Sequence, residues 1–464
     1  MKVLLINLCI RSNTPKKIYP VGLGYIASAI YRSGFELEIL NIDTHRYSDE
    51  ELETILKEKD FDVVGFGCIV TAYKIVKDLC AKIKSINKKA IIIVGNSIAT
   101  SIPQILLTKT EADIAVIGEG DVTIVELLKC LDSGSSLEFV EGICFKKDSK
   151  VIANKPRQPI KDLDTIPLPE WDLFEMDLYL RESKNWAGEP YPIPKEEIRS
   201  FPVNTARGCI FKCTFCYHVF RDNKYRFRSP KSILKEIKEL KRRYRVNYVN
   251  LWDELTFFSK KQAEALIDAM LKENLGIFWT ASCRSDLFKD QADIGLAEKF
   301  KKAGCIGLGY ALESVSPLIL KSMNKLLRME DFLTQKRILD KAGIVTWTSL
   351  VFGYPEETEE TVNETMEFCY KNDIYPSSGF LLPQPGTPMY KYILEKGVIK
   401  NVEEYLLSLG DRQDLRINLT KIPSGKFEAL VKEHLARINS KMGLGLNGGT
   451  LLKSGHYRHK QSSL

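Results

Sequence analysis

The sequence predicts an α/β protein with two successive domains: a doubly wound, Rossmann-like domain and a partial (β/α)6 barrel, followed by a small helical extension. Three observations predict this fold. Short apolar runs alternate with amphipathic stretches over the first 130 residues, a proline-punctuated stretch interrupts the alternation, and six further strand–helix units follow. Strands that alternate with helices imply crossover connections and parallel sheets. We expect domains at 1–145 and 199–398, a linker at 146–198, and an extension and tail at 399–464.

The first domain is predicted from five strand candidates, each followed by an amphipathic stretch. They are residues 2–7, 36–42, 63–67, 90–94 and 114–117. Glycine and small polar residues occur where three of these strands end, at 65–67, 95–97 and 118–120. Ligands of doubly wound domains bind outside the carboxyl ends of the strands, where glycine lets backbone approach and helix N-termini offer free N–H groups. We therefore expect a binding site along this edge.

The second domain is predicted from six strand candidates that alternate with helices. They are residues 201–205, 248–252, 277–282, 306–311, 345–352 and 379–382. The helix at 230–243 is the clearest, because Ser229 caps it and Pro230 occupies its first turn. Six such units predict a barrel or most of one. Beyond residue 397 we expect a small helical extension that includes residues 427–442.

The composition is that of an ordinary globular chain. It has 464 residues, of which 44% are hydrophobic and 27% charged, and a formal net charge of +7. No apolar run approaches the roughly 20 residues that cross a bilayer, and the first residues lack a signal-peptide cleavage site. We therefore expect a cytoplasmic protein. The basic residues are too dispersed to predict nucleic acid as a partner.

Three cysteines carry the strongest chemical pattern. The chain has eleven cysteines, an odd number, and no secretory signal, which favours thiols kept for metal binding or catalysis over disulfides. Cys209, Cys213 and Cys216 lie within eight residues, directly after the 201–205 strand. Soft thiolates on one loop suit zinc or an iron–sulfur cluster. Zinc would need a fourth ligand, for which His218 is the nearest candidate, whereas three thiolates would hold a cubane cluster with one iron open to substrate.

The spacing C-x3-C-x-aromatic-C at the end of a first barrel strand resembles the signature of the radical S-adenosylmethionine superfamily. The resemblance implies that Cys209, Cys213 and Cys216 bind a [4Fe-4S] cluster whose open iron chelates the amino and carboxylate groups of S-adenosylmethionine. It also implies that Phe215 lies beside the adenine. In that family an electron cleaves the sulfonium to give methionine and a 5′-deoxyadenosyl radical, while the protein positions the reactants.

Other residues of the predicted barrel match the same superfamily in their order along the chain. Asp253 and Glu254, after the second strand, resemble its acidic motif that meets the amino group of S-adenosylmethionine. Arg284 and Glu313 follow the third and fourth strands, where the family makes ribose and carboxylate contacts. Residues 352–358 resemble the family's glycine–proline–glutamate turn. The sequence assigns no catalytic residue beyond these cofactor contacts.

The N-terminal domain resembles that of the cobalamin-binding class of radical enzymes, and the likeness extends to about residue 400. It rests on residues 19–27, on the strand-end turns 95–100 and 118–121, and on the linker phrase 163–171. By resemblance, the domain holds the nucleotide tail of cobalamin at its strand ends. The candidate contacts are Thr71, Gly95, Ser97, Thr100, Gly118, Glu119 and Gly120. Relatives often carry Gly-Gly at the fourth strand, whereas Asn96 follows Gly95 here.

The histidines are not expected to bind cobalt. Some cobalamin proteins use an Asp-x-His-x-x-Gly loop after the first strand, but Asp43-Thr44-His45 follows the second, and Ser48 stands at the glycine position. Without a histidine from the protein, bound cobalamin would favour the nucleophilic cob(I)alamin state. His434, His456 and His459 are expected to be exposed and without a role.

These patterns predict a cobalamin-dependent radical S-adenosylmethionine methyltransferase that acts on an unactivated carbon, through methylcobalamin and a 5′-deoxyadenosyl radical. Its expected partners are a small-molecule, lipid or peptide substrate and a reductant such as flavodoxin or ferredoxin. Aromatic residues near the predicted strand ends, Trp279, Tyr310, Trp347 and Phe380, are compatible with a flat, anionic or lipid-like substrate. Aromatic side chains at such positions more often belong to the core.

Three alternatives remain open at this stage. The same scaffold carries cobalamin-dependent radical cyclases, mutases and oxidoreductases, which the motifs do not separate from methyltransferases. A radical methylthiotransferase would carry three N-terminal cysteines for a second cluster, but the spacing of Cys9, Cys68 and Cys80 is unlike that family's. A non-catalytic cobalamin-binding module would have no need of the intact triplet at 209–216.

Overall fold

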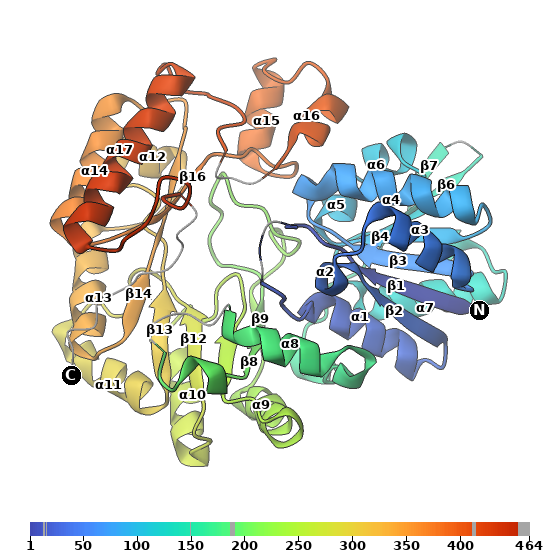
Figure 1. The fold of residues 1–464 in the computed structure, drawn as a ribbon, viewed down its shortest axis with the longest axis horizontal. Helices are drawn as coiled ribbons and strands as arrows, with labels where there is room; N and C mark the ends of the chain where they lie inside the picture. Colours follow the sequence, from blue (N-terminus) through green and yellow to red (C-terminus); the bar gives the residue numbers. More distant parts are fainter. Residues whose placement is uncertain (13, 15, 149, 186–190, 411–413, 453–464) are drawn as a thin grey trace. The chain divides into compact units, whose positions relative to one another are not determined.

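The structure is a computed structural model that describes residues 1–464 except 13, 15, 149, 186–190, 411–413 and 453–464. The described residues form two compact units (Figure 1). The first contains Met1–Asn185, Tyr217–Asn223 and Gln384–Gly410, and the second contains the remaining described residues. The main chain therefore passes from one unit to the other more than once. The domain boundaries predicted from the sequence have a single passage, through the linker.

The first unit is built on one seven-stranded sheet with the order β2-β1-β3-β4-β5-β6-β7. Its strands are β1 (Lys2–Asn7), β2 (Glu36–Asn41), β3 (Val63–Gly67), β4 (Ile91–Gly95), β5 (Ile114–Val116), β6 (Ile143–Lys147) and β7 (Lys150–Ala153). The first five are parallel, whereas β6 and β7 add an antiparallel edge. Val and Ile dominate β3 and β4 because both faces of these strands are buried.

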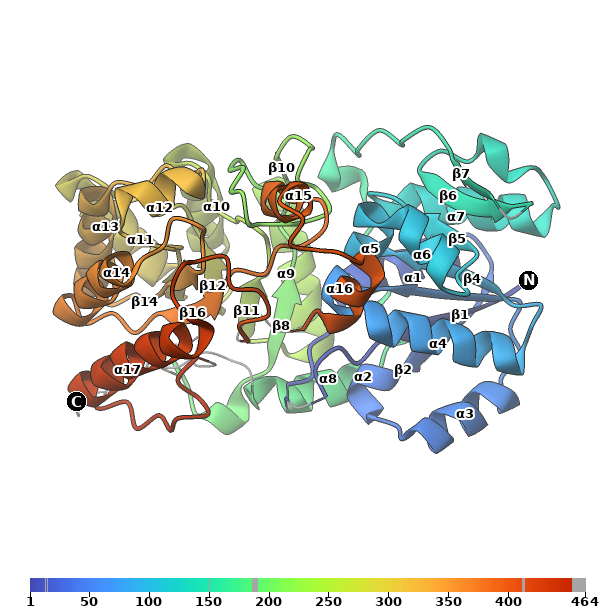
Figure 2. The same ribbon diagram turned by 90° about the horizontal axis from the view of Figure 1, so that it is seen from above.

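Helices cover both faces of this sheet, as a doubly wound domain requires (Figures 1 and 2). On one face α1 (Val21–Arg32) packs against α7 (Gly120–Asp132), and on the other α3 (Asp49–Glu58) packs against α4 (Tyr73–Ile86). Shorter helices lie at the strand ends: α2 (Ile42–His45), α5 (Asn96–Ser101) and α6 (Pro103–Lys109). The predicted alternation of strands and helices is thus confirmed.

The stretch predicted as a linker, 146–198, differs from that expectation. Its first part completes β6 and forms β7, and its residues up to Asn185 belong to the first unit. Arg32 on α1 pairs with Glu170, and Asn41 at the end of β2 donates to the Tyr179 hydroxyl at 2.8 Å on α8 (Met176–Glu182). Between β7 and α8, where every residue is described, the chain forms only two short 3-10 turns, Leu163–Thr165 and Trp171–Leu173. The polar contacts hold this segment against the sheet and its helices.

The second unit contains a curved parallel sheet with the order β14-β13-β12-β11-β8 and a separate parallel pair, β15-β16. The strands are β8 (Ser200–Val203), β11 (Tyr248–Leu251), β12 (Phe278–Ser282), β13 (Cys305–Gly309), β14 (Val345–Trp347), β15 (Ser349–Phe352) and β16 (Ser377–Phe380). A parallel bridge between Glu313 and Leu350 links the two sheets. The single strand predicted at 345–352 is interrupted at Thr348, and a short hairpin of β9 (Ala206–Arg207) and β10 (Arg226–Phe227) was not predicted.

Helices surround this barrel-like arrangement in chain order (Figure 1): α9 (Pro230–Tyr244), α10 (Lys260–Glu273), α11 (Ile294–Lys302), α12 (Pro317–Ser322), α13 (Met329–Lys341) and α14 (Glu359–Lys371). The sequence rules that predict α9 hold in the structure. Ser229 accepts a hydrogen bond from the Ser232 N–H at 3.2 Å, and Ile233, Ile237 and Leu240 are buried. Each such buried aliphatic side chain contributes about 1.5–3 kcal/mol.

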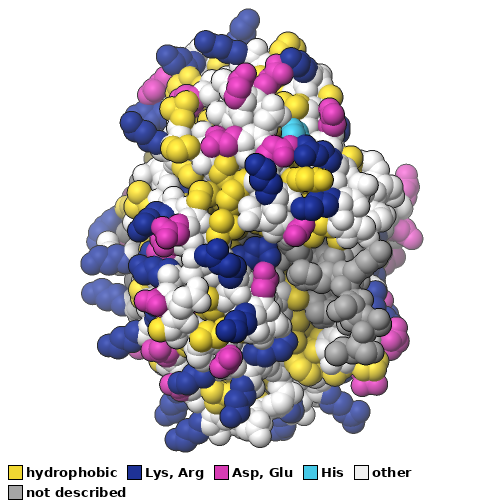
Figure 3. Space-filling view, turned by 90° about the vertical axis from the view of Figure 1, so that its left-hand side faces the viewer, with side chains coloured by type: hydrophobic (Ala, Val, Ile, Leu, Met, Phe, Trp, Pro, Cys, Tyr) yellow, Lys and Arg dark blue, Asp and Glu magenta, His cyan; other side chains and the backbone are white. Residues whose placement is uncertain are grey.

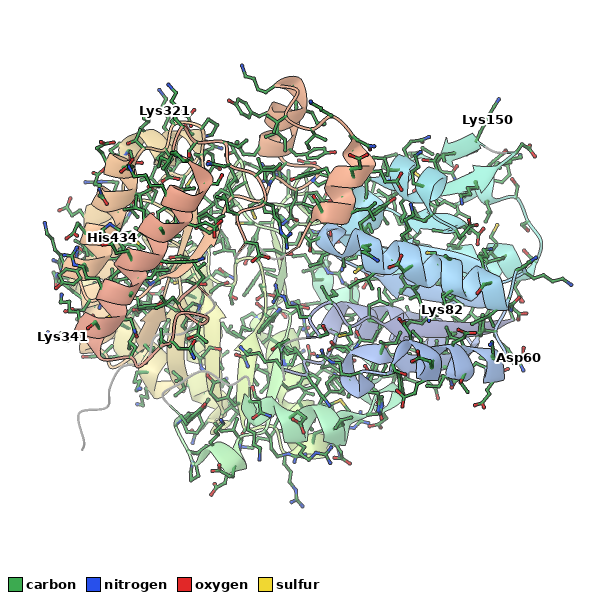
Figure 4. The ribbon with its side chains drawn as sticks, turned by 45° about the horizontal axis from the view of Figure 1, so that its top comes forward. Asp60, Lys82, Lys150, Lys321, Lys341 and His434 are labelled. Atoms are coloured by element: carbon green, nitrogen blue, oxygen red, sulfur yellow. The ribbon has the colours of Figure 1, made fainter. Side chains whose placement is uncertain are left out.

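The C-terminal extension is divided between the two units. In the first unit, α15 (Pro388–Glu395) precedes α16 (Val402–Ser408), whose Glu403 pairs with Lys77 on α4. In the second unit, α17 (Ser424–Met442) packs against α14, and Arg437 pairs with Glu367. His434 lies on α17 (Figure 4). Its Nε2 is 2.7 Å from Asn363 Oδ1, and the side chain is partly buried, so His434 is not an exposed bystander. His456 and His459 lie outside the described residues.

The surface carries charges of both signs. On the face that Figure 3 shows, Lys and Arg side chains alternate with acidic and apolar ones. Within the described part of the chain, no helix is both long and apolar enough to span a membrane.

Candidate functional site

The predicted cysteine loop opens directly into a cavity of the second unit. Cys209, Cys213 and Cys216 all line this cavity, whose volume is about 1140 Å³. Gly208, the residue before the loop, has φ +95°, a left-handed conformation that turns the chain out of β9. Burial raises the pKa of the Cys209 thiol, while the neighbouring Lys325 ammonium acts in the opposite direction. Among the described residues, no three His, Cys, Asp or Glu side chains form a preassembled metal site.

The donor chemistry of the cavity fits an iron–sulfur cluster. Three thiols from one loop share its wall, and thiolates are the ligands that such clusters use. His218, the fourth ligand that a zinc site would require, is not among the residues that line the cavity. Of the other barrel cysteines, Cys283 is buried and also lines the cavity. Cys305 and Cys369 are fully buried and remote from the cavity wall, so they pack as small apolar residues.

The two acids after β11 divide into separate roles. Glu254 lines the cavity, and its carboxylate accepts a long hydrogen bond from the Gly208 N–H at 3.3 Å. Asp253, for which a contact with S-adenosylmethionine is expected, is not among the residues that line the cavity. Its carboxylate accepts hydrogen bonds from the Thr205 N–H (2.8 Å), the Ala206 N–H (3.0 Å), and the Thr205 and Thr256 hydroxyls (2.7 and 3.0 Å). Burial raises the pKa of Asp253, and these donors oppose the rise.

The turn that Asp253 holds is the one that leads into the cysteine loop, and a second group holds its carbonyls. The Arg228 N–H donates to Thr205 O at 2.8 Å, and the Arg228 guanidinium donates to Asn204 O at 2.8 Å. Arg228 also forms a buried ion pair with Glu236 on α9. Sequence reasoning missed this pair, although a glutamate on the apolar stripe of α9 was a usable sign, because buried acids need a partner.

Three further predicted residues line the same cavity. Phe215, Arg284 and Glu313 come from the cysteine loop and from the ends of β12 and β13. The Arg284 guanidinium forms two hydrogen bonds to Asp286, of 2.7 and 2.6 Å, and lies 5.5 Å from the ring centroid of Phe211. Glu313 has φ +65°, is 5% exposed and lies 3.9 Å from Lys325 Nζ. A buried acid in this strained backbone conformation points to a functional constraint.

The glycine–proline–glutamate turn packs on the cysteine loop. Glu357 is 1% exposed, and its carboxylate accepts a hydrogen bond from the Gly353 N–H. Burial raises the pKa of Glu357 to about 7. The Tyr354 hydroxyl lies 2.7 Å from the Thr214 hydroxyl, which donates to Ser322 O at 2.8 Å. The turn therefore supports the loop between Cys213 and Cys216 from behind.

The second candidate site is the carboxyl edge of the sheet in the first unit, where hydroxyl side chains organise backbone groups. The buried Ser97 hydroxyl accepts from the Val70 N–H at 3.0 Å, and the Thr100 hydroxyl accepts from the Gly118 N–H at 3.1 Å. Asn96 has φ +68°. Asparagine tolerates the left-handed conformation better than most residues, so it serves at the position where relatives often carry glycine.

The other residues predicted to contact cobalamin at this edge differ in their exposure and in their contacts. Thr71, in the short helix Val70–Ala72, is partly exposed. Glu119 is buried and accepts from the Ile160 N–H at 2.7 Å, so it fixes the segment after β7. Gly120 begins α7, and a Cβ there would lie 2.8 Å from Ile26 Cδ1, so this glycine permits close packing of α7 on α1.

His45 is engaged by a carboxylate. Its Nε2 lies 2.8 Å from both carboxylate oxygens of Glu175. Ser48, at the position where a cobalt-binding loop would have glycine, is the N-cap of α3 and forms a reciprocal capping box with Glu51. Both side chains therefore have a structural use at the end of β2.

The sequence matches two known protein families and several known proteins. Residues 8–128 match the B12 binding domain family and residues 203–369 match the radical SAM superfamily. The chain is 28% identical over 383 residues to an uncharacterized methyltransferase, PH0819, of Pyrococcus horikoshii, covering 82% of this chain and 79% of the relative. It is also 28% identical over 398 residues to the anaerobic magnesium-protoporphyrin IX monomethyl ester cyclase of Rubrivivax gelatinosus, covering 83% of this chain and 68% of that one.

A solved structure shares the fold. The radical S-adenosylmethionine methyltransferase TsrM from Kitasatospora setae, solved with cobalamin and a [4Fe-4S] cluster bound, matches with a TM-score of 0.67 and 19% identity, over 85% of this chain and 75% of that chain. The chain therefore carries a radical SAM domain after a B12 binding domain. This combination confirms the resemblance and the fold class predicted from the sequence.

Proposed function

We propose that this enzyme is a cobalamin-dependent methyltransferase that acts on a carbon atom of a small molecule. The observation that carries the proposal is the shared cavity: the three thiols of the cysteine loop, Glu254, Arg284 and Glu313 all line it, in a chain that also has a B12-binding domain. When bound, the cofactors would supply a cleavable sulfonium, an electron source and a carrier for the methyl group.

The residues of the cavity have distinct tasks in this proposal. Cys209, Cys213 and Cys216 hold the cluster and leave one iron open. Glu254 accepts a hydrogen bond from the ammonium group of S-adenosylmethionine, because it is the acid that lines the cavity. Arg284 offers its guanidinium to a carboxylate or ribose and is kept in place meanwhile by Asp286. Asp253 binds no cofactor but fixes the turn before the cysteine loop.

The edge of the first unit holds cobalamin mainly through backbone groups. Gly95 and Gly118 leave space at the strand ends, since a Cβ at either would meet no atom within 4 Å. Ser97, Thr100 and Asn96 set the turns around them. Thr71 lies at the end of β3 and offers a hydroxyl. His45 is engaged by Glu175, so this chain offers no axial histidine there.

Two relatives bear on the substrate. TsrM was solved with tryptophan as substrate, and the relative of Rubrivivax gelatinosus is named for a magnesium-protoporphyrin ester. A small acceptor, and a flavodoxin or ferredoxin as electron donor, complete the proposal. A radical cyclase is the second candidate, because the cyclase relative is as similar in sequence as the methyltransferase relative.

The test needs no acceptor. The protein is purified without oxygen, loaded with iron, sulfide and cobalamin, and incubated with S-adenosylmethionine and a reduced flavodoxin. A methyltransferase transfers the sulfonium methyl group once to each cobalamin, so about one S-adenosylhomocysteine forms per bound cobalamin, and slow 5′-deoxyadenosine formation accompanies it. 5′-Deoxyadenosine without S-adenosylhomocysteine would favour the cyclase instead. Iron content separates the methylthiotransferase alternative, since a second cluster would give about eight iron atoms per chain and one cluster about four.

A further inference from the structure

Trp347 lies flat across two glycines in the barrel of the second unit. In the parallel pairing of β13 and β14, Gly309 is opposite Trp347 and Gly307 is opposite Val345. A Cβ added at Gly309 would lie 2.3 Å from the indole Nε1, and one at Gly307 would lie 2.7 Å from the ring. An aromatic ring that covers cross-strand glycine stabilises a sheet. Both positions must therefore be glycine for the indole to lie where it does.

The other surroundings of Trp347 are open. The residue is partly exposed and lines the cavity that the cysteine loop also lines. Tyr310 and the small residues Ala311, Ser349 and Ser377 also line this cavity. The partly exposed indole therefore presents a flat surface to the cavity.

A second tryptophan of the barrel shows the contrast. Trp279 on β12 is fully buried, its indole N–H donates to Ala303 O at 2.8 Å, and its ring packs against Phe257 and Phe300. It is a core residue, as aromatics at such positions commonly are. Within the described part of the chain, the Trp347 indole N–H has no such partner, and its ring meets no other aromatic ring in stacking or edge contact.

The position of Trp347 in the sheet is far from the strand that leads into the cysteine loop. In the order β14-β13-β12-β11-β8, the cysteine loop follows β8 at one end, and Trp347 is on β14 at the other. Glu254, Arg284 and Glu313 follow β11, β12 and β13, the strands in between. We therefore assign the wall at Trp347 to the acceptor, and the affinity for S-adenosylmethionine tests this assignment.

We infer that Trp347 is a specificity-determining residue that stacks against a flat, conjugated ring of the acceptor. Gly307 and Gly309 form the surface on which its indole packs. The inference rests on the proposed function and names the substrate class of that site. Stacking on an aromatic side chain contributes about 1–3 kcal/mol per ring, which corresponds to a change of about five- to 150-fold in affinity.

Binding to the reconstituted, oxygen-free holoenzyme tests this inference by calorimetry. The flat probes are L-tryptophan and protoporphyrin IX, and hexadecanedioic acid is a flexible probe with two carboxylates. We expect wild-type protein to bind at least one flat probe about tenfold or more tightly than the diacid. W347L keeps apolar bulk over the glycines and should weaken that flat probe about tenfold, whereas W347F should retain binding within about threefold. C369A, which removes a fully buried thiol that does not line the cavity, should leave it unchanged.

Several results would overturn the inference: no preference of wild-type protein for either flat probe, equal binding of the flat probe by W347L and wild type, or a loss in W347L that C369A shares. Affinity for S-adenosylmethionine is measured on the same variants. If W347L weakens S-adenosylmethionine as much as the flat probe, the indole stacks on adenine and the inference is wrong. Because these are binding measurements, they stand whether or not S-adenosylhomocysteine forms, so failure of the proposed reaction is distinguishable from failure of this inference.

Discussion

The carboxyl ends of parallel strands form a candidate site in each unit of this protein, but the two edges are built from different groups. In the first unit, glycines and hydroxyl side chains lie at the carboxyl edge of the sheet. The Ser97 and Thr100 hydroxyls accept hydrogen bonds from neighbouring backbone N–H groups. In the second unit, thiols, acids and arginine line a cavity of about 1140 Å³. The first edge suits a large cofactor held by shape, and the second suits ions and reactive groups.

The difference also appears in how each edge is supported. The cavity of the second unit is supported by buried ionisable groups: Asp253 with its donors, the Arg228–Glu236 pair, and Glu357. A buried charge is costly unless it is paired or hydrogen-bonded, so these groups fix loops sharply. The first edge relies on hydrogen bonds of hydroxyl groups, on one buried acid, Glu119, and on close helix packing. We therefore expect substitutions in the second unit to have larger effects.

The largest effect is expected at the cysteine loop. Replacing Cys209, Cys213 or Cys216 by alanine removes a cluster ligand and should abolish cleavage of S-adenosylmethionine. Iron content should fall from about four atoms per chain to well below that value. Cobalamin binding should persist, because it depends on the first unit. C369A, which removes a thiol that is fully buried away from the cavity, is the matched control and should keep both iron and activity.

The next effect is a pH dependence at Glu357. Its pKa of about 7 in the folded protein lies above the ordinary value of 4.5, so the folded state holds the proton more tightly than the unfolded state. The free energy of unfolding is therefore highest below about pH 4.5, falls as the pH rises, and levels off above pH 7, for a total of about 3 kcal/mol. Urea unfolding of the apo-protein between pH 5 and 8 measures this slope.

The variant E357Q cannot titrate and should lose that part of the slope. Glu356 is the matched control, because it is exposed and adjacent; E356Q should keep the wild-type slope. An unchanged slope in E357Q would contradict the assignment of this proton to Glu357.

The third effect separates the two adjacent acids. D253N places an amide donor against the Thr205 and Ala206 donors and should lower the free energy of unfolding by about 2 kcal/mol or more, since hydrogen bonds to charged groups contribute about 1.5–3 kcal/mol each. It should also lower iron retention. E254Q should unfold like wild type but bind S-adenosylmethionine about tenfold more weakly, because it loses one charge-assisted hydrogen bond. If both variants behaved alike, the division of roles between the two acids would be wrong.

The smallest effect is expected at the edge of the first unit. Gly95 has φ −123°, an ordinary extended conformation, and a Cβ there would meet no protein atom within 4 Å. G95A should therefore unfold like wild type, yet its methyl group should weaken cobalamin about tenfold by intruding on the ligand. Absorbance titration with cobalamin measures this. G22A, in the first turn of α1, likewise meets no atom within 4 Å and should leave cobalamin binding unchanged. If G95A and wild type bound cobalamin with equal affinity, cobalamin would not contact Gly95 and this prediction would be wrong.

The sequence predicted the features that depend on local pattern. Apolar periodicity predicted the strands and helices of both units, and the spacing of three cysteines predicted the loop that lines the cavity. Features that depend on long-range pairing were not accessible. The packing of α16 on α4 rests on Glu403 and Lys77, which are 326 residues apart. The packing of Trp347 on Gly307 and Gly309 depends on the register of β13 against β14. The order of motifs along the chain assigned Asp253 and Glu254 the same role, because it does not show which of the two acids faces the cavity.

The central claim is that three thiols of one loop hold a cluster whose open iron binds S-adenosylmethionine in the cavity of the second unit. The most direct test is the electron paramagnetic resonance spectrum of the reduced, reconstituted protein with and without S-adenosylmethionine. The account predicts a [4Fe-4S]⁺ signal that shifts when S-adenosylmethionine is added and that is missing in the C213A variant. A spectrum that does not respond to S-adenosylmethionine, or that persists unchanged in C213A, would contradict it.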